Sequence, residues 1–163
     1  MKKKICIFSL LFFIIDIVSK IIIKTSFSLY ESIQVIPNFF NLTYVMNEGA
    51  AFSILSGKQI LLIILAIILL IFLGYYINKE ELNNYKVIYY SLLIGGIVGN
   101  LFDRIIYNSV IDFLDFKIFG YDYPIFNLAD SFIVIGVILI IIEVIRKDFY
   151  ENRSKRKWKF KNR

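Results

Sequence analysis

Asp130 lies in the stretch PIFNLADSFIVIGVILIII, residues 124–142, at the start of a run of apolar residues long enough to enter a bilayer. A carboxylate that faces hydrocarbon costs about 2.5–3.5 kcal/mol on insertion scales, so Asp130 requires compensation. Asn127 can cap a helix that begins after it. Asp130 is then the third helical residue, where free backbone N–H groups and the helix dipole favour a carboxylate. This capping role is one of two interpretations of Asp130.

The second interpretation is acid–base chemistry. Asp112, Asp115 and Asp122 all precede Asp130 within eighteen residues. Two carboxylates that converge on one spot cannot both ionise comfortably, so one stays protonated and the pair holds both an acid and a base. Such a pair can activate water against a peptide carbonyl without a metal ion or a nucleophilic side chain. Spacing alone does not indicate which of the three acids is the partner of Asp130.

Composition excludes other kinds of chemistry. The 163 residues include no His and one Cys, Cys6, so the chain lacks the residues of a typical zinc site, of Ser-His or Cys-His catalysis and of an intrachain disulfide. We expect no metal and no cofactor. The net charge of +6 does not indicate a nucleic-acid partner, because nine of the nineteen Lys and Arg lie between Arg146 and Arg163.

The elements that must position these acids are membrane helices, since 58% of the residues are hydrophobic. Four stretches are apolar enough to span about 30 Å of hydrocarbon, which takes ~20 helical residues: 5–23, 60–77, 87–102 and 128–145. The N-terminus resembles a secretory signal peptide. However, Asp16 and Lys20 stand where a cleavage site would be expected, so we interpret it as a retained helix. The predicted fold class is an all-α polytopic membrane protein.

Charge predicts the orientation of these helices. Fourteen cations lie at the termini and in the loop 78–86, against four on the other side of the membrane, Lys24, Lys58, Arg104 and Lys117, which places both termini in the cytoplasm and both longer loops outside. We assign residues 1–147 to the membrane domain and 148–163 to a basic cytoplasmic tail. This tail has the charge density of a disordered segment held against anionic lipid.

Each long loop has a distinctive pattern. In the first, FFNLTYVM (39–46) alternates after a Pro37-Asn38 turn, which predicts a small antiparallel sheet, and Gly57 is expected to close a short helix from Ala50. The second is aromatic around Gly120, so we expect it to rest on or dip into the membrane interface.

Several polar residues interrupt the apolar helices. Asp16 and Lys20 are four residues apart, so they either pair with each other or both face an interior site. In GGIVGNLFDR (95–104), glycines one turn apart allow close helix packing. Asn100, Asp103 and Arg104 share one face of that helix, where the last two either cap it at the headgroups or serve a site. Asn47 and Gly49 in NEGAAF are by themselves a weak turn signal.

Five motifs together resemble the lipoprotein signal peptidase (signal peptidase II) family, bacterial aspartic proteases of the membrane. They occur in the family's order and cover Asp16 to about Gly136. They are DIVSK from Asp16, NEGAAF from Asn47, GGIVGNLFDR from Gly95, VIDF from Val110 and FNLAD from Phe126.

The resemblance implies a four-helix enzyme, expected to be a monomer, that cuts a diacylglyceryl-modified prolipoprotein within membrane lipid, just before the lipidated Cys. By motif, Asp112 and Asp130 correspond to the catalytic dyad. The residues that correspond to those holding the dyad and the substrate are Asp16, Lys20, Asn47, Gly49, Asn100, Asp103, Arg104 and Asn127. The two outer loops would form a small β-platform and a flap.

An alternative function is a small proton-coupled transporter or channel, because intramembrane carboxylates also occur there. That function predicts carboxylates at mid-membrane depth and broken helices. Only Asp16 lies well within a predicted helix.

Overall fold

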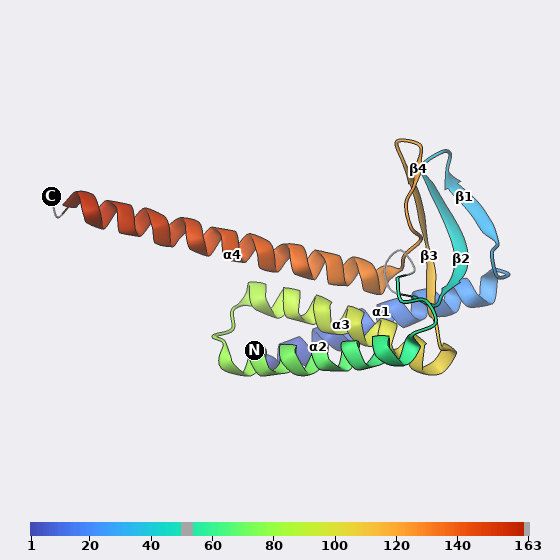
Figure 1. Cartoon of the computed structure of the whole chain (residues 1–163), viewed down its shortest axis with the longest axis horizontal. Coiled ribbons are helices and arrows are strands. Elements are labelled where there is room, and N and C mark those ends of the chain that lie inside the picture. The colour runs from blue at the N-terminus through green and yellow to red at the C-terminus, as the bar shows by residue number, and fades with distance from the viewer. Residues whose placement is uncertain (50–53, 162–163) are drawn as a thin grey trace.

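Four long helices and one small antiparallel sheet make up the described part of the chain, residues 1–49 and 54–161, in the computed structural model (Figure 1). The helices run side by side, the sheet crosses one end of the bundle, and both termini lie at the other end (Figure 1). In chain order the elements are α1 (Lys2–Ser26), β1 (Ser32–Ile36), β2 (Phe40–Asn47), α2 (Gln59–Lys79), α3 (Asn84–Tyr107), β3 (Val110–Ile118), β4 (Tyr121–Asp122) and α4 (Leu128–Lys161).

All four helices are long and apolar enough to cross a membrane, which confirms the predicted fold class within the described residues. Each extends beyond the predicted apolar stretch, because flanking polar residues continue the helical backbone. Large apolar side chains such as Ile60, Ile68 and Ile71 on α2 point away from the protein and are exposed. A helix that is apolar on all sides is stable in lipid rather than in water.

Helix α3 packs against the other three helices, and its glycines permit the closest approaches. A Cβ at Gly95 would lie 2.6 Å from Phe12 Cβ of α1, and one at Gly96 would lie 2.8 Å from Ile133 Cγ1 of α4. A Cβ at Gly99 would collide with the Asp16 carboxylate. The predicted packing role of the glycines is therefore confirmed, and it brings α1 and α4 together on α3.

Both long loops contribute strands to one sheet, in the order β1-β2-β3-β4. The predicted hairpin is confirmed: β1 pairs with β2 across a turn in which Asn38 has a φ of 56°. The second loop was expected to form a flap, and its residues 110–122 extend this sheet: β3 pairs with β2, and β4 pairs with β3. Consecutive residues of β3 are buried on both faces, so this strand lacks the polar–apolar alternation that marks a half-exposed strand.

The sheet is attached to the bundle by a small apolar core. Ile23 of α1, Tyr44 of β2, and Ile111 and Phe113 of β3 are buried together there. Residues on either side of Asp112 are thus fixed against the end of α1, which places the Asp112 side chain at the junction of sheet and helices.

Two further predictions concern the end of the last helix and the segment before α2. Helix α4 does not end near residue 145 but continues to Lys161 through the tail that we expected to be disordered. The sequence after Gly136 contains neither Gly nor Pro, so no residue there breaks the helix. The predicted short helix from Ala50 begins outside the described residues, and residues 54–57 form a turn that ends at Gly57, with a φ of 76°.

Candidate active site

A buried cation lies where α1 faces α3. Lys20 Nζ is 2.7 Å from Asp16 Oδ2 and 3.0 Å from Asp103 Oδ2, and it donates a 3.0 Å hydrogen bond to Asn100 Oδ1. Both interpretations of the Asp16 and Lys20 pair therefore hold at once: they pair with each other, and they face an interior cluster. A buried ammonium with this many acceptors is compensated for its lost hydration.

The first turn of α4 is capped from two directions. Asn127 Oδ1 accepts a 2.9 Å hydrogen bond from the Asp130 N–H, and Asp130 Oδ2 accepts one of 3.3 Å from the Asn127 N–H, which is a reciprocal capping box. Asp16 Oδ1 accepts a 2.9 Å hydrogen bond from the Ala129 N–H. The predicted capping geometry is confirmed. The other carboxylate oxygen, Asp130 Oδ1, takes no part in the cap and accepts a 2.7 Å hydrogen bond from Asn100 Nδ2.

Asp112 lies on strand β3, not in a loop as the sequence suggested, and its side chain is 1% exposed. Its Oδ1 accepts a 2.7 Å hydrogen bond from Asn127 Nδ2, and its Oδ2 accepts one of 2.8 Å from Asn47 Nδ2. Because Asn127 also caps the helix of Asp130, one side chain links the two carboxylates.

Burial is the largest cause of an unusual pKa at Asp112, and the nearby charge of Asp130 adds to it. Together they raise the pKa of Asp112 from 3.8 to about 7, although hydrogen bonds from Asn47 and Asn127 favour the ionised form. Asp112 therefore exchanges a proton near neutral pH, whereas an ordinary Asp is fully ionised there.

Arg104 borders this cluster on the side of the first loop. Its Nη2 donates to the Gly49 carbonyl at 3.1 Å and its Nη1 to the Asn100 carbonyl at 3.3 Å. The Gly49 N–H donates in turn to Asn47 Oδ1 at 2.8 Å. The turn at residues 47–49 thus connects Arg104 to the amide that holds Asp112. The remaining residues of the NEGAAF motif, 50–52, lie outside the described residues.

The structure brings every predicted site residue into one network of hydrogen bonds and ion pairs: Asp16, Lys20, Asn47, Gly49, Asn100, Asp103, Arg104, Asp112, Asn127 and Asp130. The other two candidate partners lie apart from it. Asp115 accepts hydrogen bonds from Asn41 and Thr43, and Asp122 pairs with Lys117 on the sheet.

Gln59 contacts the turn at residues 47–49, and the sequence did not predict it as a site residue. Its side chain is 4% exposed, and its Nε2 donates to the Glu48 carbonyl, which also accepts from the Gly57 N–H at 3.1 Å. Its Oε1 is buried and has no hydrogen-bond partner within residues 1–49 and 54–161. The available signal was a single amide at the start of an apolar run.

Known proteins resemble this chain in sequence and in fold. The family profile described as signal peptidase (SPase) II matches residues 8–146. A lipoprotein signal peptidase of Staphylococcus aureus (strain bovine RF122 / ET3-1) is 48% identical over 134 residues, 82% of each chain. A bacterial membrane enzyme solved by the in meso method at 2.3 Å resolution superposes with a TM-score of 0.84 at 44% identity, covering 88% of both chains. A second, at 1.9 Å, gives a TM-score of 0.79 at 45% identity, covering 86% of this chain and 91% of the other.

Proposed function

The chain belongs to the signal peptidase II family, and on that premise we propose that it removes signal peptides from diacylglyceryl-modified prolipoproteins by hydrolysing the peptide bond before the lipidated Cys. The observation that supports this most is the junction of β3 with the start of α4. Two carboxylates, Asp112 and Asp130, meet there and are linked through the amides of Asn127 and Asn100.

The charge balance of the network favours a shared proton. Four carboxylates, Asp16, Asp103, Asp112 and Asp130, are accompanied by the two cations Lys20 and Arg104. Full ionisation would leave two uncompensated negative charges in a largely buried site, whereas one retained proton leaves a single one. The raised pKa of Asp112 is in the direction expected for a group that takes part in holding this proton.

The proposed reaction is an aspartic peptide hydrolysis. The ionised member of the pair takes a proton from water as the water oxygen attacks the scissile carbonyl carbon, while the protonated member donates to the carbonyl oxygen. The C–N bond then breaks as the amine of the lipidated Cys receives a proton from the pair. The signal peptide leaves with the new carboxyl group at its C-terminus. Because the pair shares its proton, the two carboxylates exchange these roles during the reaction.

The partners of the dyad limit its freedom to move. Asn47 and Asn127 hold both oxygens of Asp112, and Asn100 and the capping box hold Asp130. Fixed hydrogen-bond donors around a site of changing charge reduce the reorganisation needed during reaction. Arg104 provides a cation at the edge of this site, where its guanidinium can contact a substrate carbonyl.

The decisive experiment is cleavage of a diacylated prolipoprotein by the purified protein in detergent. Asp112→Asn and Asp130→Asn are each expected to reduce product to background while the protein stays folded, because Asn keeps the shape of Asp but cannot exchange the proton. The double variant is expected to be no worse than either single one, since residues that act as a unit are non-additive.

Asp115→Asn is the matched control, because Asp115 lies on the same strand but contacts Asn41 and Thr43 instead. It is expected to retain most of the activity. Cleavage by Asp130→Asn at the wild-type rate would reduce Asp130 to a helix cap, for which Asn is an equally good residue. The transporter alternative predicts no cleavage product from any of these proteins, the wild type included.

A further inference from the structure

An apolar strip covers the face of the sheet that carries Asp112. Side chains alternate between the two faces of a strand, so Asp112, Leu114 and Phe116 share one face of β3. In β2, Leu42 is paired in register with Leu114, and Phe40 is paired with Phe116. Residues paired directly opposite each other lie on the same face of a sheet, so these two side chains extend the strip onto β2.

Three phenylalanine rings stack across this strip. The ring centroids of Phe40 and Phe116 are 4.6 Å apart, and those of Phe116 and Phe126 are 5.7 Å apart, with the ring planes within 26° of each other. Phe126 forms an antiparallel bridge with β3, and the next residue is Asn127, whose amide donates to Asp112. These three residues, which we call the phenylalanine row, therefore begin beside the proposed dyad and continue over β3 and β2.

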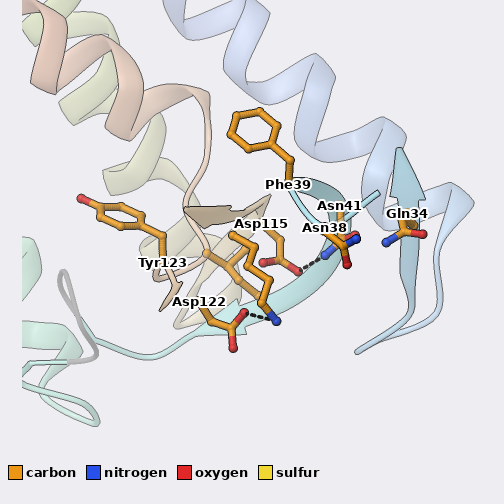
Figure 2. A pocket seen from close by; sticks show the side chains of 9 residues that line it. Gln34, Asn38, Phe39, Asn41, Asp115, Asp122 and Tyr123 are labelled. Atoms are coloured by element: carbon orange, nitrogen blue, oxygen red, sulfur yellow. Dashed lines mark hydrogen bonds and ion pairs between the residues drawn. The ribbon is translucent and has the colours of Figure 1, made fainter. Parts of the chain in front are cut away.

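The two faces of this part of the sheet differ in chemistry. On the opposite face Asn41 donates to Asp115, and Lys117 pairs with Asp122, around a pocket of about 350 Å³ (Figure 2). The three rings of the phenylalanine row, in contrast, are only half-buried although they contain no polar atom. A partly open apolar surface of this kind indicates a contact with an apolar ligand or with lipid.

The chemistry of the strip restricts its occupant. Phe and Leu side chains offer no hydrogen bond, so an extended polypeptide on the strip would lose the hydration of its peptide groups without replacement. The apolar helix of a signal peptide must cross about 30 Å of hydrocarbon beside the bundle, whereas the sheet crosses the end of the bundle (Figure 1). A hydrocarbon chain needs no hydrogen bonds and can make many carbon–carbon contacts with stacked rings.

The position of the row matches the point where lipid is attached to the proposed substrate. The diacylglyceryl group is carried by the side chain of the residue directly after the cleaved bond. Leu114 follows Asp112 by two residues on the same face, about 7 Å along the strand, and Phe116 follows it by four, about 13 Å. A long acyl chain that starts beside the cleaved bond can therefore lie across the row, whereas a short one ends before it.

We propose that the phenylalanine row binds an acyl chain of the substrate's diacylglyceryl group, an inference that rests on the proposed function. The row then sets a preference for long acyl chains and holds the lipidated Cys against the dyad.

The test compares two substrates in detergent that have the same polypeptide and differ only in their acyl chains, palmitoyl in one and butyryl in the other. The variants are Phe40→Ala, which removes the ring at the end of the row, and Phe116→Leu, which keeps an apolar side chain but removes the central flat ring. The control is Phe119→Ala, because this fully exposed aromatic side chain lies in the turn between β3 and β4, outside the row.

For the palmitoyl substrate, each row variant is expected to raise KM about 3- to 10-fold, the effect of losing the carbon–carbon contacts of one ring, with kcat unchanged. The wild type should have a lower KM for the palmitoyl than for the butyryl substrate. For the butyryl substrate, the row variants and the wild type should be indistinguishable. Phe119→Ala should change neither KM.

Equal increases of KM for both substrates would show that the row supports the fold or the polypeptide and not the acyl chain, which overturns the inference. The same effect from Phe119→Ala would reduce the row to a general contact with lipid or detergent and would overturn it too. So would an unchanged KM for the palmitoyl substrate, or a wild type with no preference between the substrates. Melting temperatures identify a variant that does not fold, and Phe116→Leu decides if Phe40→Ala is unfolded.

If the wild type cleaves neither substrate, the proposed function itself has failed and the inference falls with it. That result is distinct from cleavage of both substrates without an effect of the row.

Discussion

At the scale of single residues, the four carboxylates of the network divide into two kinds. Asp16 and Asp103 each form an ion pair with Lys20. Asp112 and Asp130 form no ion pair in the part of the chain that the structure describes, and their nearest partners are the neutral amides of Asn47, Asn100 and Asn127. Neutral amide donors favour the ionised carboxylate less strongly than a buried ammonium does, so the second kind is suited to proton exchange.

The titration of Asp112 leads to a prediction about stability. In the folded protein its pKa is raised to about 7 from the ordinary value of 3.8. Between these values the folded state holds a proton that the unfolded state has released, so this group's contribution to stability falls as pH rises from about 4 to 7. Asp112→Asn removes the titration. Relative to the wild type, we expect the variant to gain roughly 2–4 kcal/mol between pH 5 and pH 8.

Thermal unfolding of both proteins in the same detergent, measured across this pH range, gives the difference directly. The new side chain of the Asp112→Asn variant also brings its own N–H donors against a neighbouring amide donor, so one hydrogen bond accepted by Asp112 is lost. The cost of that loss does not depend on pH. The test is therefore how the stability difference between the two proteins changes with pH. A difference that stays constant from pH 5 to pH 8 would contradict the raised pKa.

Gln59 is expected to act as a positioning residue through the turn at residues 47–49. Gln59→Met keeps the length of the side chain but removes the donor to the Glu48 carbonyl, which then keeps only the Gly57 N–H. We expect kcat to fall about 2- to 10-fold while the melting temperature changes little, because the unpaired Oε1 is removed as well.

The neighbouring Lys58→Met variant is the control, since that exposed side chain contributes to no described hydrogen bond of the site. It should behave as the wild type does. Equal losses of kcat and melting temperature in Gln59→Met would assign Gln59 to folding alone.

At the scale of elements, the glycine face of α3 determines how close α1 and α4 come to each other. Gly99 lies against the carboxylate of Asp16 and 3.3 Å, measured from its ideal Cβ, from the Cβ of Ala129. A methyl group there must displace Asp16, which holds the first turn of α4 through the Ala129 N–H. Gly99→Ala is therefore expected to lower both activity and melting temperature, because α4, which carries Asp130, can no longer pack fully against α3.

Gly74→Ala is the matched substitution for comparison, since a Cβ at that position on α2 meets nothing within 4 Å. It is expected to leave activity unchanged and to stabilise the helix by up to about 1 kcal/mol. Cleavage and unfolding are measured on the same preparations. If the two Ala variants prove equivalent, close packing at Gly99 has no functional importance.

The start of α4 allows capping to be separated from positioning. Asn127→Ser preserves a capping oxygen but is too short to donate to Asp112 and Asn100. We expect a folded protein with a melting temperature close to that of the wild type and a cleavage rate reduced at least tenfold. Full activity in this variant would limit Asn127 to capping.

The elements differed in how well the sequence predicted them. The four helices were evident because each is a long uninterrupted apolar run, and the first hairpin was evident from its alternation and its Pro37-Asn38 turn. Strand β3 was not, because Ile111 packs in the apolar core while the adjacent Asp112 is buried in the polar network. A strand buried on both faces has no period of two to detect.

The same limit applied to the site. Spacing left Asp112, Asp115 and Asp122 equivalent as partners of Asp130, and the motif resemblance, not physical reasoning, selected Asp112. The distinction depends on which face of β3 and β4 each residue occupies, and that is set by pairing with β2, a contact between residues far apart in sequence. Gln59 was missed for the same reason, since its partner Glu48 is defined by the tertiary fold.

At the scale of the whole molecule, the two ends of the bundle are chemically different. The sheet and the proposed active site lie at one end, and both termini lie at the other (Figure 1). Helix α4 contains 34 residues, about 51 Å at 1.5 Å per residue, whereas the hydrocarbon is about 30 Å thick. Its last turns must therefore leave the membrane on the side away from the sheet, and they carry most of the tail's cations.

This asymmetry predicts the orientation in the cell membrane. Fourteen cations lie at the termini and around the loop between α2 and α3, against four at the sheet end of the bundle, Lys24, Lys58, Arg104 and Lys117, so the positive-inside rule places the sheet outside the cytoplasm. In a Cys6→Ser background, we expect a membrane-impermeant thiol reagent applied to intact cells to label Tyr30→Cys and Tyr121→Cys, whose native side chains are 72% and 64% exposed. Glu81→Cys, in the loop between α2 and α3, should react only after the membrane is permeabilised. Labelling of Glu81→Cys in intact cells, with Tyr30→Cys and Tyr121→Cys protected, would invert the orientation and place the proposed active site on the cytoplasmic side, where no translocated prolipoprotein could present its cleavage site.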